Sequence, residues 1–170
     1  MNVILIGYRG SGKTTVGRLL AQRLHRPFID ADDRIVAAAG KSIQQIFAEH
    51  GEPHFRDLEQ AVISELAILN DHVLALGGGA LGRAATRSTL AGERHRLIYL
   101  RCDPAELLRR VSADTATPAN RPPLTNLDPL AEIRTILAGR EPIYLQCMHA
   151  QVDVTGLAPE AAAAAVAKLL

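Results

Sequence analysis

The stretch that most constrains this chain is GYRGSGKT at residues 7–14. It matches the phosphate-binding pattern G-x-x-x-x-G-K-[ST] at every fixed position. An apolar run at residues 3–6 precedes it and favours a buried strand, while residues 14–24 follow with apolar positions at helical spacing. Strand, glycine loop and helix occur in the order that this motif requires. The match therefore predicts a nucleotide-binding site, and a glycine-rich turn that binds nothing is the less favoured alternative.

The residue types of this motif account for its chemistry. Glycines allow backbone N–H groups to turn toward phosphate oxygens, and the N-terminus of the following helix adds partial positive charge. Lys13 can reach the β- and γ-phosphates of a nucleotide, and the hydroxyl of Thr14 can ligate Mg²⁺.

Bulk composition limits the possible classes of protein. A length of 170 residues, 48% of them hydrophobic, predicts a single domain, 1–170, with a substantial core. The net charge of +1 lacks the basic excess typical of nucleic-acid-binding proteins. Cys102 and Cys147 are far apart in sequence, which is typical of reduced thiols in a cytoplasmic protein. We expect no signal peptide and no membrane span.

Strand-like and helical patterns alternate along the chain. Strands are predicted at 3–6, 28–29, 73–76, 97–100 and 151–154, and helices at 14–24, 33–39, 42–50, 55–70, 83–91, 104–113, 129–148 and 159–170. This alternation predicts an α/β fold of three layers, with helices on both faces of a parallel sheet. Ligands of such sheets bind beyond the carboxyl ends of the strands.

Two aspartates follow the second predicted strand, Asp30 and Asp32. Residues two apart in an extended chain point the same way, so we expect both carboxylates on one side, near the phosphates. One could support Mg²⁺ through water, and the other could receive or orient a substrate hydroxyl. The alternative is that an aspartate here only caps the helix that begins near Asp33.

Three further features suit an anionic acceptor. Arg56 and Glu59 are three apart and share a helix face, which can fix a guanidinium for bidentate binding of a carboxylate, although an ordinary surface ion pair has the same spacing. The glycines at 77–79 directly follow the third strand and allow a ligand to approach the backbone. Arg140, late in a long helix, could act as a second anion clamp.

One segment, residues 114–126, breaks the alternation because it is rich in turn formers and poor in core residues. A loop of this length in a compact domain is typical of a lid, although a passive linker is the alternative. It contains a single arginine, Arg121.

Taken together, these features resemble the shikimate kinases, small P-loop kinases of aromatic amino acid biosynthesis. The matching pieces occur in order over nearly the whole chain: GxxxxGKT at 7–14, Asp30-Ala31-Asp32, Gly51-Glu52-x-x-Phe55-Arg56-x-x-Glu59, Gly77-Gly78-Gly79, Arg121-Pro122, Arg140 with Pro142 and Tyr144, and Val152-Asp153-Val154. The resemblance implies a five-stranded parallel sheet in the order 2-3-1-4-5. It also implies transfer of the ATP γ-phosphate to the 3-hydroxyl of shikimate.

Roles carried over from the resemblance fall into four groups. The implied ATP-binding residues are Gly10, Ser11, Gly12, Lys13, Thr14, Thr15, Arg110 and Arg121. The implied shikimate-binding residues are Asp32, Arg56, Glu59, Gly77, Gly78, Gly79 and Arg140. The implied metal residues, for one Mg²⁺, are Thr14 and Asp30. Lys13, Asp32 and Arg121 would be catalytic. We expect a cytoplasmic monomer that binds ATP and shikimate, with neither nucleic acid nor membrane as a partner.

Two other functions compete with this interpretation. A different small P-loop kinase, such as a gluconate kinase, also binds a polyol carboxylate, and the motif from Gly51 to Arg56 together with the glycine triplet favours shikimate over gluconate. A regulatory nucleotide-binding module is disfavoured because it has no physical need for the full set Lys13, Asp32, Arg56, Arg121 and Arg140.

The predicted lid yields a test that depends on Arg121. We expect hydrogen exchange in residues 114–126 to slow when ADP and shikimate bind, because the segment has few core contacts of its own. Arg121→Ala is expected to abolish this protection and to lower kcat by roughly the 10³-fold scale of catalytic arginines. Equal exchange in both states, together with an active variant, would identify the segment as a passive linker.

Overall fold

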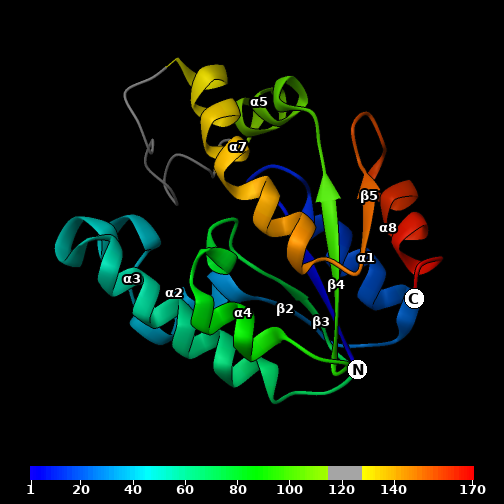
Figure 1. The fold of residues 1–170 in the computed structure, drawn as a ribbon, viewed down its shortest axis with the longest axis horizontal. Coiled ribbons are helices and arrows are strands. Elements are labelled where there is room, and N and C mark those ends of the chain that lie inside the picture. The colour runs from blue at the N-terminus through cyan, green and yellow to red at the C-terminus, as the bar shows by residue number, and fades with distance from the viewer. Residues whose placement is uncertain (115–127) are drawn as a thin grey trace.

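The computed structural model describes residues 1–114 and 128–170. Within them, β1 (Asn2–Ile6), β2 (Phe28–Asp30), β3 (Val73–Ala75), β4 (His95–Arg101) and β5 (Ala150–Asp153) form one sheet. All the pairings are parallel, and the order is β2-β3-β1-β4-β5 (Figure 1). The predicted α/β class and strand order 2-3-1-4-5 are therefore confirmed.

Helices lie on both faces of this sheet, as predicted. In Figure 1, α4 and α7 lie in front of the sheet, whereas α1 and α8 lie side by side behind it. The bounds are α1 (Lys13–Leu24), α2 (Ala31–Ala39), α3 (Ile43–Ala67), a 3₁₀ turn η1 (Ala80–Gly82), α4 (Ala84–Leu90), α5 (Pro104–Ala113), α7 (Pro129–Cys147) and α8 (Pro159–Ala167).

The core is centred on β1, which pairs with β3 on one side and with β4 on the other. All five residues of β1 are buried, as expected of a central strand covered by helices on both faces. The apolar run at residues 3–6 therefore reflects burial on both faces of the sheet. Because β1 leads directly into the glycine loop, the core fixes the position of that loop.

Short polar residues begin several of the helices. Ser42 forms a capping box with Gln45 at the start of α3, and Asp103 and Asp128 cap α5 and α7, each followed by proline at the first helical position. These caps satisfy backbone N–H groups that have no partner within a helix. Local sequence thus sets where these helices begin.

The structure corrects the predicted boundaries of α2 and α3. The helix expected from Asp33 begins at Ala31, because Asp30 is its cap. The two helices expected at 42–50 and 55–70 both lie within α3, and a non-helical residue, Gly51, with φ of 77° and ψ of 175°, separates them as predicted. Glycine adopts this conformation at little cost. Pro53 is tolerated because it lies just after the break, where the helix restarts.

The contact between α1 and β2 provides a test of the packing. A Cβ atom at Gly17 would lie 2.4 Å from Cε2 of Phe28 and 3.3 Å from Cδ1 of Leu5. We expect Gly17→Ala to lower the unfolding temperature, since overpacking costs about 1–3 kcal/mol and outweighs the roughly 1 kcal/mol by which alanine favours a helix.

Gly139→Ala is the matched control, because a Cβ atom at this helical glycine meets nothing within 4 Å. It is expected to raise the unfolding temperature. Equal stabilisation by both substitutions would contradict the close packing of α1 on Phe28.

Candidate active site

The glycine loop joins β1 to α1 at the carboxyl edge of the sheet. Gly10 and Gly12 have φ values of +83° and +91°, a region that favours glycine, and Gly12 immediately precedes α1. No acidic residue lies in the first turn of α1, so the positive end of the helix dipole is not opposed there. The Lys13 ammonium donates to the carbonyl oxygens of Gly7 and Tyr8, each at 2.9 Å, and so lies against the loop.

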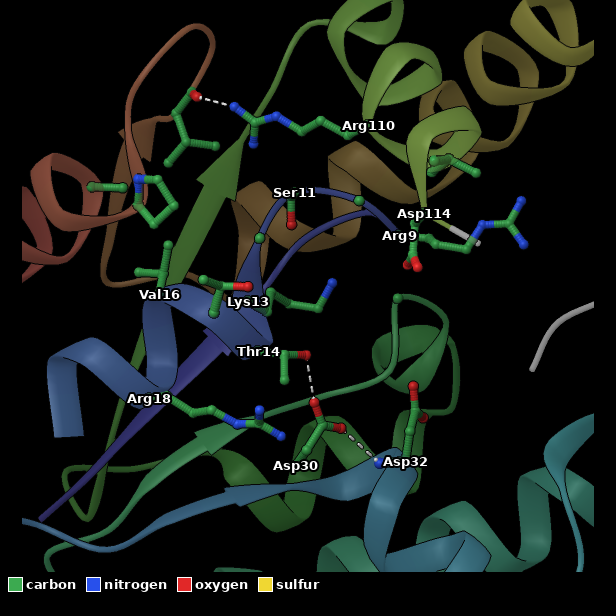
Figure 2. Close-up of a pocket in the computed structure, with 18 of the residues that line it drawn as sticks. Arg9, Ser11, Lys13, Thr14, Val16, Arg18, Asp30, Asp32, Arg110 and Asp114 are labelled. Carbon is green, nitrogen blue, oxygen red and sulfur yellow. Dashed lines mark hydrogen bonds between the residues drawn. The ribbon is translucent and has the colours of Figure 1, made fainter. Parts of the chain in front are cut away.

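Thr14 and Asp30 are in direct contact. The hydroxyl of Thr14 donates to Oδ2 of Asp30 at 2.7 Å, while Oδ1 of Asp30 accepts from the backbone N–H of Asp32 at 3.0 Å (Figure 2). A hydroxyl and a carboxylate beside a phosphate loop are hard oxygen donors of the kind that Mg²⁺ prefers. In the described part of the chain there is no group of three or more His, Cys, Asp or Glu side chains able to hold a metal ion by themselves. These two oxygen donors therefore suit a metal that is also held by phosphate and water.

The expectation that Asp30 and Asp32 lie two apart in an extended chain is wrong. Only Asp30 is extended, because Ala31 already begins α2 and Asp32 lies in its first turn. The cap of α2 is also Asp30, and neither Asp32 nor Asp33 has that role. Both Asp30 and Asp32 nevertheless line the same cavity (Figure 2). Burial, together with the charge of Asp30, raises the pKa of the neighbouring Asp33.

A cavity of about 990 Å³ extends along the carboxyl edge of the sheet. Its walls combine the glycine loop, the aspartates after β2, the glycines after β3, one face of α5 and the turn after β5. The predicted site residues that line it are Gly10, Ser11, Gly12, Lys13, Thr14, Thr15, Asp30, Asp32, Gly77, Gly78 and Arg110. Its volume is that of a small-molecule site.

Arg56 and Glu59 form a buried ion pair beside the glycine turn. Nη1 of Arg56 lies 2.6 Å from Oε2 of Glu59, and the residue Glu59 is only 3% exposed. Nε and Nη2 of Arg56 both donate to Glu52. Burial raises the pKa of Glu59, and the guanidinium of Arg56 offsets part of that rise. Burial works to lower the pKa of Arg56, but the two carboxylates outweigh it and the pKa is raised. Arg56 is therefore a fixed, charged guanidinium.

Two guanidinium groups lie against the glycine triplet. A Cβ atom at Gly79 would lie 2.6 Å from Nη2 of Arg56, and one at Gly78 would lie 3.5 Å from Nη1 of Arg140. Arg140 also lies over the ring of Tyr8, 6.0 Å from its centroid. The structure thus brings Arg56 and Arg140, 84 positions apart in sequence, to one turn. A Cβ atom at position 79 would displace the guanidinium of Arg56, so glycine there allows this close approach.

Arg110, on α5, lines the cavity close to the turn after β5. Its Nε donates to Glu106 at 2.7 Å and its Nη2 donates to the carbonyl oxygen of Val154 at 2.8 Å (Figure 2). Hydrogen bonds from Arg109 and then Arg110 lower the pKa of Glu106 to about 2. Arg110 therefore bridges α5 and the turn after β5, beside the glycine loop.

Four predicted substrate-binding residues, Arg56, Glu59, Gly79 and Arg140, are not among the residues that line this cavity. Arg121 and most of the segment 114–126 lie outside the described residues. The hydroxyl oxygen of Ser11 is buried, with no hydrogen-bond partner among the described residues, and Thr15 is exposed at the cavity.

Four residues were given no site role from the sequence, although two of them, Glu52 and Tyr144, belong to the matching motif pieces. Glu52 and Glu106 each lie four positions before an arginine with which they pair, Arg56 and Arg110. This i,i+4 spacing could have predicted both ion pairs. Arg9 occupies a variable position of the glycine loop and lines the cavity. Tyr144 reaches Gly78, a contact that only the fold reveals.

Fold and site together define a P-loop kinase, with a phosphate loop on the cavity and the guanidinium groups of Arg56 and Arg140 against a glycine triplet that contributes Gly77 and Gly78 to the cavity wall. The comparisons with known proteins agree. A sequence profile described as Shikimate kinase matches residues 9–170. The shikimate kinase of Thermobifida fusca is 42% identical over 167 residues, which cover 98% of this chain and 93% of that protein.

Two other relatives extend this likeness. The shikimate kinase of Nitrobacter winogradskyi is 48% identical over 145 residues, covering 85% of this chain but 65% of that protein. The solved structure of shikimate kinase from Acinetobacter baumannii in complex with shikimate superposes with a TM-score of 0.91 at 36% identity, covering 99% of this chain and 91% of that one. The chain therefore belongs to the shikimate kinase family, ATP-dependent kinases of aromatic amino acid biosynthesis.

Within residues 1–114 and 128–170, no helix combines the length and the apolar character that a membrane span needs.

The two contacts of Asp30 predict a difference between two substitutions. Asp30→Asn retains an N-cap side chain and is expected to be nearly as stable as the wild type, whereas Asp30→Ala removes the cap and costs about 1 kcal/mol of unfolding free energy. Denaturant unfolding measures both. Asp33→Ala, which removes an exposed acid 3.9 Å from Arg18, is the control and is expected to change little. Equal stability of the Ala and Asn variants at position 30 would contradict the capping role.

Proposed function

We propose that this chain transfers the γ-phosphoryl group of ATP to the 3-hydroxyl of shikimate, with one Mg²⁺ bound between Thr14, Asp30 and the phosphates. The observation that carries the proposal is the pair of guanidinium groups, Arg56 and Arg140, beside the glycine turn on the cavity that holds the phosphate loop. Phosphoryl transfer needs a bound nucleotide and an aligned acceptor more than covalent help. This arrangement supplies a place for each.

The nucleotide half of the site is formed by the glycine loop and α1. Backbone N–H groups at Gly10, Ser11, Gly12 and Thr15 would hold the phosphates, and Lys13 would exchange its bonds to the carbonyl oxygens of the loop for phosphate oxygens. When bound, Mg²⁺ would neutralise charge on the β- and γ-phosphates. The hydroxyl oxygen of Thr14 already lies 2.7 Å from Oδ2 of Asp30, so these two oxygens can support that ion, directly or through water.

Arg110 would form the wall of the nucleoside end. It is held by Glu106 and by the carbonyl oxygen of Val154, and it lies close to Gly12, so its planar group is fixed beside the loop. A fixed guanidinium plane offers a stacking surface for a base.

The part of the site for shikimate combines two arginines that would bind its carboxylate with an aspartate that would accept a hydrogen bond from its hydroxyl. Arg56 and Arg140 would bind the carboxylate of shikimate, and Glu59 would keep Arg56 in place. The backbone of the glycine turn, residues 77–79, would line the substrate. Asp32 lines the cavity beside the glycine loop, where it would accept a hydrogen bond from a substrate hydroxyl and orient it toward the γ-phosphate.

We infer a cytoplasmic location and a monomeric state. Both cysteines are free, which suits a reducing compartment.

A coupled assay of ADP release tests the proposed reaction. ADP release is expected with shikimate and Mg²⁺ present, and not with gluconate in place of shikimate. Lys13→Ala is expected to abolish release while circular dichroism remains that of the wild type, since the side chain binds phosphate and is not part of the core. Turnover with gluconate alone, or near-normal turnover by a folded Lys13→Ala enzyme, would overturn the assignment.

The clamp predicts that Arg56→Lys is not conservative. An ammonium group cannot reproduce the planar contact with Glu52, Glu59 and a substrate carboxylate. We expect kcat/KM for shikimate to fall tens- to hundreds-fold, equivalent to about 2–3 kcal/mol, while the KM for ATP stays near wild type. Arg83→Lys is a matched control, because Arg83 forms an exposed ion pair with Asp57. An equal rise in both KM values for Arg56→Lys would indicate a structural role.

A further inference from the structure

The helix segment that carries Arg140 has low intrinsic helix propensity. Gly139 precedes Arg140, and Pro142 lies two residues after it inside α7. Glycine and proline are the two least favourable residues in a helix interior, and proline removes one helical hydrogen bond. The position of Arg140 therefore depends on contacts between α7 and the rest of the fold.

Tyr144 provides such a contact from the same helix face. It is four residues after Arg140, is 2% exposed, and its hydroxyl donates a hydrogen bond to the carbonyl oxygen of Gly78. Among the described residues, Tyr144 is the only donor to this buried carbonyl group. Because the Gly78 carbonyl is buried, loss of that donor would leave it without a hydrogen bond.

Arg140 and Tyr144 therefore converge on one glycine. The guanidinium of Arg140 lies beside the α-carbon of Gly78, and the hydroxyl of Tyr144 holds its carbonyl oxygen. In a trans peptide the N–H of the next residue points opposite to the carbonyl. Holding the carbonyl oxygen of Gly78 toward α7 thus turns the N–H of Gly79 away from α7. No described residue accepts a hydrogen bond from that N–H.

We propose that Tyr144 is a positioning residue for the substrate carboxylate clamp, because its hydroxyl fixes the peptide between Gly78 and Gly79 and sets the distance from Arg140 to the glycine turn. This inference rests on the proposed function. Tyr144 is buried and its hydroxyl is bonded to Gly78, so we assign it no direct contact with substrate or nucleotide. It acts through Gly78 and through the docking of α7, so its loss weakens shikimate binding and leaves ATP binding intact.

The test is Tyr144→Phe in the full chain, with Tyr99→Phe as the matched control. The two rings pack together with centroids 5.1 Å apart, and both are buried. The hydroxyl of Tyr144 donates from α7 to the glycine turn, and that of Tyr99 donates from β4 to α7. The hydroxyl of Tyr99 goes to Glu141, which keeps Arg101 at 3.8 Å as a second partner, and it does not touch the glycine turn. Both variants therefore lose a buried hydroxyl from the same aromatic pair.

We expect Tyr144→Phe to raise the KM and the calorimetric Kd for shikimate about tenfold, on the scale of one buried carbonyl left unpaired. The KM for ATP and the circular dichroism spectrum are expected to stay at wild-type values, and Tyr99→Phe is expected to change the KM for shikimate less than twofold. Wild-type affinity in Tyr144→Phe, or equal effects of both substitutions, would overturn the inference.

The same experiment separates this inference from the proposed function. If the wild-type enzyme releases no ADP with shikimate and calorimetry detects no shikimate binding, both the proposed function and the positioning role of Tyr144 fail. If the wild-type enzyme uses shikimate and Tyr144→Phe binds it normally, only the positioning role fails.

Discussion

The parallel arrangement of the strands is the constraint on which the site depends. Because every strand runs the same way, all the segments that follow them meet at one edge. The glycine loop after β1, the aspartates after β2 and the glycine turn after β3 are contributed by three parts of the chain, yet they line one cavity. The buried centre of the sheet, β1, fixes the edge because its side chains are packed by helices on both faces.

Electrostatics then decide which residues can remain charged at this edge. A guanidinium that is largely removed from water needs compensation, and Arg56 receives it from Glu52 and Glu59. Arg110 is similarly held by Glu106. In each case a carboxylate on the same helix fixes the cation before any ligand binds. Such preorganisation lowers the cost of ordering these long side chains when an anionic ligand arrives.

The sequence predicted most elements because the signals were local. Alternating patterns located all five strands of the described sheet, and the motif at 7–14 located the phosphate loop. The errors were also local in origin. The start of α2 was placed two residues late, at Asp33, because Asp30 was not recognised as the cap of this helix. By contrast, the break in α3 at Gly51 was predicted correctly as the end of one helix and the start of another.

By itself, the sequence determined the phosphate loop and the charged residues available to a site, because these depend on short spacings and residue types. The expected strand order came from the resemblance to the shikimate kinases. Only the tertiary structure decided which of those residues meet. Arg56 and Arg140 share a glycine turn, and Tyr144 bonds to Gly78, because α3, α7 and the segment after β3 converge at the sheet edge. No local pattern encodes such contacts, since they arise from packing between residues far apart in the chain.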